Sequence, residues 1–371
     1  MRFFNRIDWL MITSAVLLSL AGLSSMYGFG TGSSFAGRQV VWLTISLILF
    51  FVLSGIDFRF LRRTGSVIAL YLISLFFLAL LFILGSVFQG AQSWFDFGSF
   101  SIQPSDPAKF ALIVVLAKYF SRRHIEIARI RHLATSGAYM LAMFALLFFQ
   151  PDFGSAVIIL GLWVGMVLIA GIPFRHLLTL AGAGLMVIVL LWTFAFADYQ
   201  KERILSFIHP LADLQGAGYN AFQSTVAVGS GGILGKGIGY GTQSRLQFLP
   251  EHETDFIFAA FSEEWGFIGT LLLLTLFGVL IYRLVENARQ GSTNFETLFA
   301  LGVATLFIVH AIIHVGMNIG LLPVTGVTMP FMSYGGSHLV TEYAMLGIVN
   351  AMRMYSRAVH EDERHEMVGV T

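Results

Sequence analysis

The sequence predicts an all-α polytopic membrane protein with about ten transmembrane helices, cytoplasmic N- and C-termini, and a large extracytoplasmic loop between helices 7 and 8. Hydrophobic residues make up 56% of the 371 residues and charged residues only 12%, about half of the roughly 25% typical of soluble domains. A soluble two-domain enzyme is therefore excluded. The absence of cysteine from the sequence also excludes disulfides, thiolate metal sites and a cysteine nucleophile.

Ten apolar segments account for this prediction, since a helix needs about 20 apolar residues to cross a hydrocarbon core roughly 30 Å thick. They lie near residues 9–27, 39–55, 66–88, 106–120, 134–149, 154–171, 176–196, 256–284, 296–321 and 338–354. The fourth and fifth are short or polar at one end. The apolar run of the first is too long for a cleaved signal peptide.

The basic residues indicate the orientation, because Lys and Arg in short loops stay on the cytoplasmic side. Most of them fall on alternate loops, which places both termini inside. The other side receives Arg38, Lys201, Arg203, Lys236 and Arg245. All of these except Arg38 belong to the loop 197–255, the only extramembrane segment long enough to hold structure, so we expect residues 1–371 to form a single membrane domain.

Ionisable residues at membrane depth are functional candidates, because inserting each one costs roughly 2.5–3.5 kcal/mol. The candidates are Asp106, Lys109, Asp152, Asp255, Glu263, Glu264, His310, His314 and Glu342. Asp255 opens the eighth segment at the outer surface, where it could meet a lipid head group and water. Alternatively, Thr254 or Asp255 caps the helix. Glu263 could share the face of Asp255, whereas Glu264 points away and is expected to pair with another helix.

Asp106 and Lys109 are three residues apart, so they share a helical face and can pair. The sequence favours another role for Asp106, as an N-cap followed by Pro107 at the first helical position. Lys109 lies inside the apolar run "AKFALIVVLA" and needs an anion nearby. Whether Asp106 is that anion stays open at this point.

Two further motifs suggest binding sites only weakly. His310 and His314 have the spacing of a metal pair, but "HAIIH" lacks the glutamate of a zinc hydrolase, which favours two packed, hydrogen-bonded imidazoles. The segment "GSGGILGKG" resembles a phosphate loop loosely. Its backbone N–H groups and Lys236 could bind a phosphate, and a flexible turn explains the glycines equally well.

Several blocks of sequence together resemble the SEDS family of bacterial membrane proteins (shape, elongation, division and sporulation). The blocks include "GAQSWFDFG" at 90–98, "IQPSDPAKFA" at 102–111, "QPDFGSA" at 150–156, "GAGYNAFQSTVAVGSGGILGKG" at 216–237, "GTQSRLQFLPEHETDFIFA" at 241–259, "EEWGFIG" at 263–269 and "GMNIGLLPVTGVTMPFMSYGGS" at 316–337. They span nearly the whole chain in order. The segments "GSGGILGKG" and "GTQS" resemble the RodA branch of the family more than the FtsW branch.

The resemblance implies a peptidoglycan glycosyltransferase of cell wall biogenesis in the bacterial cytoplasmic (inner) membrane. Such an enzyme polymerises lipid II into glycan strands at the outer face during cell elongation and rod-shape maintenance. A class B penicillin-binding protein supplies the transpeptidase, other elongation-complex proteins are further partners, and nucleic acid is not a partner. The essential Asp of the family corresponds to Asp255, which we expect to be the general base of an inverting transfer from an undecaprenyl-pyrophosphate-linked donor.

The matching blocks also imply substrate contacts. The expected set is Lys109, Asp106, Asp152, Arg203, Gln223, Ser224, Lys236, Gln243, Glu251, Ser333 and Ser337. Charge on the pyrophosphate could be offset by a Lys or Arg side chain, with Lys109, Lys236, Arg203 and Arg245 as candidates, or by a divalent cation. No cofactor is certain; Mg²⁺ or Mn²⁺ held by Asp255 and the substrate is an open alternative.

Other functions also fit parts of the sequence. A lipid II flippase or transporter would have similar spans and interrupted helices, although we find no symmetric repeat. A scaffold that only recruits its partner, and a division or sporulation paralogue with the same chemistry, are further alternatives. The sequence departs from the family at Ser93, where a basic residue is usual, at Asp106–Pro107, where Glu and an aliphatic residue are usual, and at His209, where Asp is common.

Overall fold

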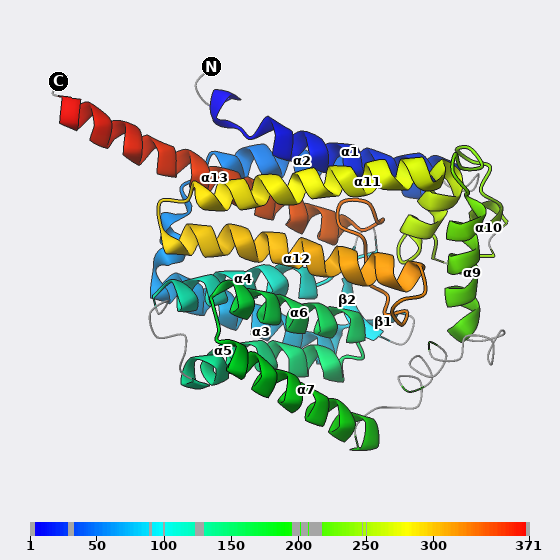
Figure 1. The fold of residues 1–371 in the computed structure, drawn as a ribbon, viewed down its shortest axis with the longest axis horizontal. Helices are drawn as coiled ribbons and strands as arrows, with labels where there is room; N and C mark the ends of the chain where they lie inside the picture. Colours follow the sequence, from blue (N-terminus) through cyan, green and yellow to red (C-terminus); the bar gives the residue numbers. More distant parts are fainter. Residues whose placement is uncertain are drawn as a thin grey trace.

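The computed structural model describes residues 4–28, 33–88, 91–98, 101–122, 130–194, 201, 207, 217–246, 248–249 and 251–368. Ten helices of 17 residues or more lie within these ranges and run side by side (Figure 1). They are α1 (Trp9–Gly28), α2 (Ser33–Ser54), α3 (Thr64–Leu84), α4 (Ser105–Ser121), α5 (Ile130–Phe149), α6 (Phe153–Ile169), α7 (Phe174–Phe194), α11 (Ile257–Arg289), α12 (Asn294–Asn318) and α13 (Gly336–Val368). Each overlaps one segment that the sequence predicts to be apolar.

Six of these helices are long and apolar enough to cross a bilayer, namely α1, α2, α3, α5, α11 and α12. Helix α6 and residues 178–194 of α7 are shorter apolar helices. A helix satisfies its own backbone hydrogen bonds, which is why apolar sequence becomes helical in lipid. The chain is therefore a multi-pass membrane protein. The finer expectation of ten crossings stays a prediction.

The core is centred on α12, which contacts α4, α6 and α11, while α13 packs on α2 and α1 packs on α11. Glycines allow the close approach of α6 to α12. A Cβ atom on Gly161 would lie 2.7 Å from the Val309 side chain, and one on Gly165 would lie 2.3 Å from that of Thr305. Small residues at such contacts let helix backbones approach in a membrane protein, where dispersion contacts replace the hydrophobic effect between helices.

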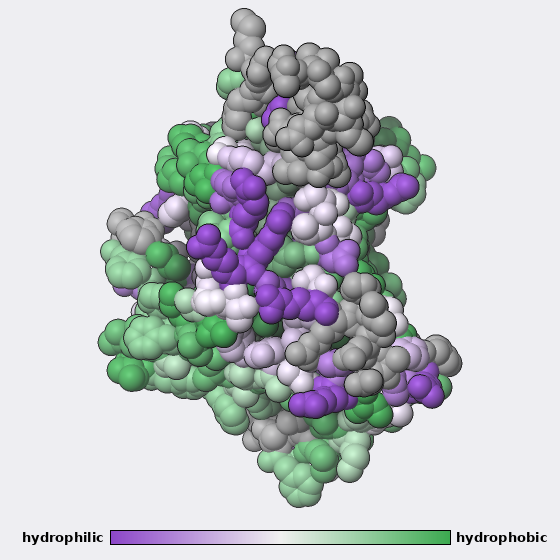
Figure 2. Space-filling view, turned by 90° about the vertical axis from the view of Figure 1, so that its left-hand side faces the viewer, coloured by the Kyte–Doolittle hydropathy of each residue, from purple (hydrophilic) through white to green (hydrophobic). Residues whose placement is uncertain are grey.

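One end of the bundle is polar and carries both termini (Figures 1 and 2). Asp8 is buried at the start of α1 and receives hydrogen bonds from Arg283 at 2.8 and 3.1 Å. Arg353 lies 3.2 Å from the same carboxylate. Arg62, in the 3₁₀ helix η2 (Phe58–Arg62), pairs with Glu296 at the start of α12. An even number of crossings would bring the two termini to one side in this way.

The opposite end carries the shorter elements. A three-stranded antiparallel sheet is made of β1 (Ser86–Phe88), β2 (Ala91–Asp96) and β3 (Ser101–Ile102). The third apolar segment was expected to continue to residue 88, and this boundary is wrong. Helix α3 ends at Leu84 because Gly85 takes an extended conformation, and residues 86–88 pair with β2. Helices α9 (Ala217–Ser230) and α10 (Thr242–Arg245) lie within the expected outer loop 197–255.

Helix α11 is broken at Gly266, whose φ of 66° and ψ of −166° are not helical. The glycine loop, residues 231–241, packs into this break. The backbone N–H groups of Lys236 and Gly237 donate to the carbonyl oxygens of Glu263 and Glu264, each at 3.0 Å. These donors thus complete the broken helix and are not available to a phosphate.

Two more bonds join the glycine loop to the other side of the break. They run from the N–H groups of Phe267 and Ile268 to the carbonyl oxygens of Gly232 and Ile233, at 2.9 and 3.2 Å. The backbones are so close that a Cβ atom on Gly235 would lie 2.1 Å from the Glu264 carbonyl oxygen. The glycines are therefore required by packing against α11, and not only by the freedom of a turn.

We predict that Gly235→Ala lowers the unfolding temperature of the detergent-solubilised protein. The new methyl group clashes with the α11 backbone and the residue has a φ of +81°, so we expect a loss of about 2 kcal/mol or more. The matched control is Gly229→Ala, whose Cβ would meet nothing within 4 Å in the helix α9. Equal melting temperatures for the two variants would contradict the packing described above.

Candidate functional site

Asp255 packs against the segment that joins α12 to α13, residues 319–335, which is called the α12–α13 loop. The N–H of Tyr334 donates to the Glu253 carbonyl at 2.8 Å, and the Ser333 hydroxyl donates to the Thr254 carbonyl at 2.7 Å. A Cβ atom on Gly326 would lie 3.5 Å from Oδ2 of Asp255. The half-buried Asp255 side chain is thus placed between the start of α11 and this loop.

Asn318, the last residue of α12, binds the backbone of Asp255 and of the first turn of α11 that follows it. Its Nδ2 donates to the carbonyl of Asp255 at 3.1 Å, and its Oδ1 accepts from the N–H of Ala259 at 3.2 Å. Asn318 is fully buried. The N-cap of α11 is Phe256, whose side chain makes no capping bond, so neither Thr254 nor Asp255 has the capping position considered from the sequence. Asn318 satisfies a helix-end donor from another helix instead.

Two predicted site residues belong to α9. The buried Ser224 hydroxyl donates to the carbonyl of Asn318 at 2.8 Å, which joins α9 to the same cluster. Gln223 is half-buried on the same helix. The predicted Glu251 is exposed before α11, and its carbonyl accepts the N–H of Asp255 at 3.0 Å. These residues therefore surround the turn that carries Asp255.

Lys236 and Gln243 gather around Glu263 rather than around Asp255. The Lys236 ammonium lies 2.7 Å from Oε1 of Glu263, and the N–H of Gln243 donates to the same carboxylate at 3.2 Å. Glu263 is fully buried. Glu264 accepts the N–H of Gly239 at 2.8 Å. Both glutamates thus hold the glycine loop against α11, a structural role that accounts for their burial.

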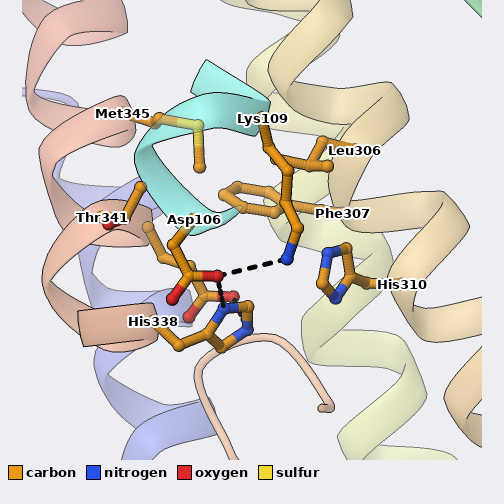
Figure 3. A pocket seen from close by; sticks show the side chains of 9 residues that line it. Asp106, Lys109, Leu306, Phe307, His310, His338, Thr341 and Met345 are labelled. Carbon is orange, nitrogen blue, oxygen red and sulfur yellow. Dashed lines mark hydrogen bonds and ion pairs between the residues drawn. The ribbon is translucent and has the colours of Figure 1, made fainter. Parts of the chain in front are cut away.

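Asp106 and Lys109 form a buried ion pair at the start of α4 (Figure 3). The ammonium nitrogen lies 3.1 Å from Oδ1 of Asp106. The N-cap of α4 is Pro104, so the sequence-based preference for Asp106 as the cap is wrong. The pair forms because Asp106 lies one turn before Lys109 and faces the same helices. Asp106 also accepts a hydrogen bond from the Ser337 hydroxyl of α13 at 2.9 Å.

Asp152 is linked to this pair through Gln103. The Asp152 carboxylate caps α6 by accepting the N–H of Ser155 at 3.0 Å, and it accepts from Nε2 of Gln103 at 3.2 Å. The N–H of Gln103 in turn donates to the Ser337 hydroxyl at 3.4 Å. Asp106, Lys109, Asp152 and Ser337 therefore form one polar network at the ends of α4, α6 and α13. Arg203, the remaining predicted contact, lies outside the described residues.

The two histidines of α12 bind the backbone of the α12–α13 loop. Nδ1 of His310 lies 3.3 Å from the Thr328 carbonyl, and Nδ1 of His314 lies 2.7 Å from the Val327 carbonyl. The prediction of packed, hydrogen-bonded imidazoles is confirmed. Within the ranges that the structure describes, no three His, Asp or Glu side chains are grouped to hold a metal ion. A cation held jointly by Asp255 and a substrate stays untested.

Two residues of this end were not identified from the sequence. Asn318 ends the apolar helix α12, and a single amide carries no motif. His338 lies between Asp106, at 3.3 Å from Oδ1, and Glu342, at 2.9 Å from Oε1. The spacing of four residues between His338 and Glu342 on one helix could have indicated this pair. His338 also points into the pocket lined by Lys109 and His310 (Figure 3).

The fold and these buried polar clusters define a multi-pass α-helical membrane protein with a half-buried carboxylate at the end opposite its termini. Residues 2–358 match the model of a protein family described as cell cycle protein, the FtsW/RodA/SpoVE family. The chain belongs to this family, which is the SEDS family.

Similar proteins have related names. Stage V sporulation protein E of Bacillus subtilis is 35% identical over 94% of this chain and 98% of its own length. The peptidoglycan glycosyltransferase MrdB of Escherichia coli is 33% identical over 92% of each chain. A probable peptidoglycan glycosyltransferase FtsW of Saccharophagus degradans is 33% identical over 93% of this chain and 92% of its own. The names of these relatives thus include peptidoglycan glycosyltransferases and a sporulation protein.

Solved structures share the whole fold. A chain from work on the structural coordination of polymerization and crosslinking by a peptidoglycan synthase complex superimposes with a TM-score of 0.82 at 32% identity, covering 94% of this chain and 98% of that one. The rod shape determining protein RodA of Thermus thermophilus superimposes with a TM-score of 0.70 at 30% identity, covering 94% of this chain and 96% of that one.

We predict that Asn318→Leu loosens the first turn of α11. The change leaves the Asp255 carbonyl and the Ala259 N–H without this partner, at about 1–3 kcal/mol for each buried group. Hydrogen–deuterium exchange of peptides covering residues 253–262 should become faster. The control is Asn350→Leu, which removes a buried amide bonded to the N–H of Asp8 at the other end. Similar exchange at 253–262 in both variants would disprove the role of Asn318.

Proposed function

We propose that this protein is a peptidoglycan glycosyltransferase that polymerises lipid II at the outer face of the cytoplasmic membrane, with Asp255 as the general base. The observation that carries the proposal is the position of Asp255. Its carboxylate is half-buried at the end of the bundle opposite the buried arginines, and its backbone is held by Asn318. The names of MrdB and FtsW among the similar proteins support the same chemistry.

The reaction requires one base and one departing diphosphate. Asp255 takes the proton from a sugar hydroxyl of the acceptor, and that oxygen forms a bond to the anomeric carbon of the donor. The bond from this carbon to the lipid diphosphate breaks, and the diphosphate leaves with the electron pair. A single well-placed carboxylate suits this inverting displacement, because a retaining enzyme would need a second carboxylate as nucleophile.

Arg245 is the best supported counter-charge for the diphosphate among the described candidates. It is exposed on α10 and forms no ion pair with any residue that the structure describes. Lys109 is buried against Asp106, and Lys236 is bound to Glu263. Their charges are already balanced within the protein. An exposed guanidinium can form paired, charge-assisted hydrogen bonds with a phosphate.

We further propose ten membrane crossings with both termini in the cytoplasm, and a role in cell elongation beside a class B penicillin-binding protein. The meeting of Asp8, Arg283 and Arg353 at one end supports the topology, because it joins the start of α1 to the region near the end of α11 and to the middle of α13. The likeness to a chain from a peptidoglycan synthase complex supports a transpeptidase partner. Fluorescent lipid II offered only from the outer face separates this proposal from a flippase, since polymerisation requires no translocation.

We predict that Asp255→Asn lowers the rate of glycan polymerisation from lipid II by a factor of about 10²–10⁴, while the protein still folds. The amide keeps the shape of the side chain and loses the base. Polymer is measured with purified protein in the presence of its transpeptidase partner. Asp57→Asn is the matched control, because Asp57 is a carboxylate beside η2 at the opposite end. Normal polymerisation by Asp255→Asn would refute the assignment.

Arg245→Ala is expected to raise the KM for lipid II about tenfold, the effect of losing one charge-assisted hydrogen bond. Arg245→Lys should retain part of the affinity, because the charge remains and the paired geometry is lost. Arg59→Ala tests for an unspecific effect of charge, since Arg59 is exposed at the other end of the molecule. An unchanged KM for Arg245→Ala would remove Arg245 from the site.

A further inference from the structure

A second buried ion pair lies beside Asp106 and Lys109. His338 and Glu342 are one turn apart on α13, with Nε2 of His338 at 2.9 Å from Oε1 of Glu342. The other ring nitrogen, Nδ1, lies 3.3 Å from Oδ1 of Asp106. His338 is 9% exposed and Glu342 only 2%. The imidazole therefore bridges two buried carboxylates that come from different helices.

The bridge balances charge when both carboxylates are ionised. Asp106 and Glu342 then carry two negative charges, and Lys109 carries one positive charge. A charged His338 makes the group neutral, whereas its loss leaves a buried carboxylate without a partner charge, which is strongly unfavourable. Two further titratable neighbours are His310 and His314 of α12. The ring of His310 lies 5.2 Å from that of His338, and the Nδ1 atoms of His310 and His314 are engaged by the Thr328 and Val327 carbonyls.

The same two residues hold the α12–α13 loop. The Thr328 hydroxyl lies 3.0 Å from Nε2 of His338, and the N–H of Phe331 donates to Oε2 of Glu342 at 2.8 Å. Phe331 has a φ of +63°, which a bulky residue adopts only when its surroundings impose it. Its ring is buried against Phe307, with centroids 5.0 Å apart. Glu342 thus fixes the most strained residue of the loop that covers Asp255.

We propose that His338 and Glu342 are positioning residues, which join the Asp106–Lys109 pair to the α12–α13 loop and thereby hold that loop over Asp255. The inference rests on the proposed function, because it assigns Asp255 as the base. His338 and Glu342 do not touch the substrate in this account. They act through the hydroxyl of Thr328 and the backbone N–H of Phe331, and the loop carries their effect to Ser333, which binds the Thr254 carbonyl.

The test compares His338→Gln, Glu342→Gln and the double variant. His338→Gln alone leaves two carboxylates with one lysine, and we expect turnover to fall about tenfold or more while KM changes less than about twofold. The double variant retains one carboxylate and one lysine, so we expect turnover to return to within about threefold of the wild type. The proposal would be overturned if the relative turnover of the double variant equalled the product of the relative turnovers of the two single variants, because the two residues would then act independently. It would also be overturned if His338→Gln changed only KM.

Hydrogen–deuterium exchange supplies a measurement that does not depend on activity. Peptides covering residues 324–335 should exchange faster in His338→Gln and regain protection in the double variant. Unchanged exchange in His338→Gln would overturn the inference whatever the activity. If His338→Gln fails to fold, the charge-balanced double variant must recover folding, and its failure to do so counts against the bridge.

Two controls separate the possible failures. His132→Gln removes a buried histidine of α5 that is bonded to the Tyr119 hydroxyl, and it should leave turnover unchanged. Asp255→Asn reports on the proposed function itself. An inactive Asp255→Asn with a fully active His338→Gln would refute only the positioning role, whereas an active Asp255→Asn would refute the base.

Discussion

The α12–α13 loop is a non-helical stretch of backbone inside a membrane bundle, and its polar groups must find partners within the protein. Lipid offers none, so such a segment survives only where other parts of the chain satisfy it. Here His310 and His314 bind its carbonyl oxygens, and Glu342 and Ser333 accept its N–H groups. The ionisable residues at this depth therefore have a structural reason to be present. The position of Asp255 depends on this loop, because the loop packs against the turn before α11 that carries Asp255.

The same constraint explains the break in α11. Gly266 leaves two carbonyl oxygens and two N–H groups of the helix without helical partners, and the glycine loop supplies all four bonds. Glu263 and Glu264 then bind that loop through their carboxylates. The glycine loop is thus attached to α11 by its backbone, and the side chain of Lys236 takes part in this attachment.

The sequence predicted the helices well because crossing a bilayer imposes a minimum apolar length, which can be read from one segment at a time. The sequence also predicted that Lys109 needs an anion. A charge inside an apolar segment is costly whatever the rest of the chain does, so this too can be read from one segment. The sequence did not predict that Asp106 would be that anion instead of a cap, because both roles need the same residue at the same place in the chain. Asn318 could not be assigned, since the groups that it binds around Asp255 and Ala259 belong to another part of the chain. For His338 the spacing to Glu342 was a signal, but the contact with Asp106 on α4 could not be predicted from one helix. The strands after α3 were missed because residues 86–88 continue an apolar run.

The carboxylates of this protein differ in their exposure, and the difference supports Asp255 as the reactive group. Glu263 is fully buried and is bound by an ammonium and by backbone N–H groups, and Asp106 is bound by Lys109 and Ser337. A carboxylate enclosed in this way lies out of reach of a substrate hydroxyl, and a general base must come within hydrogen-bond distance of the proton that it takes. Asp255 is half-buried, and the bonds from Asn318 and Ser333 go to backbone atoms around it. The protein fixes the position of Asp255 through the main chain, and its partly exposed side chain meets the requirement of access that the enclosed carboxylates do not.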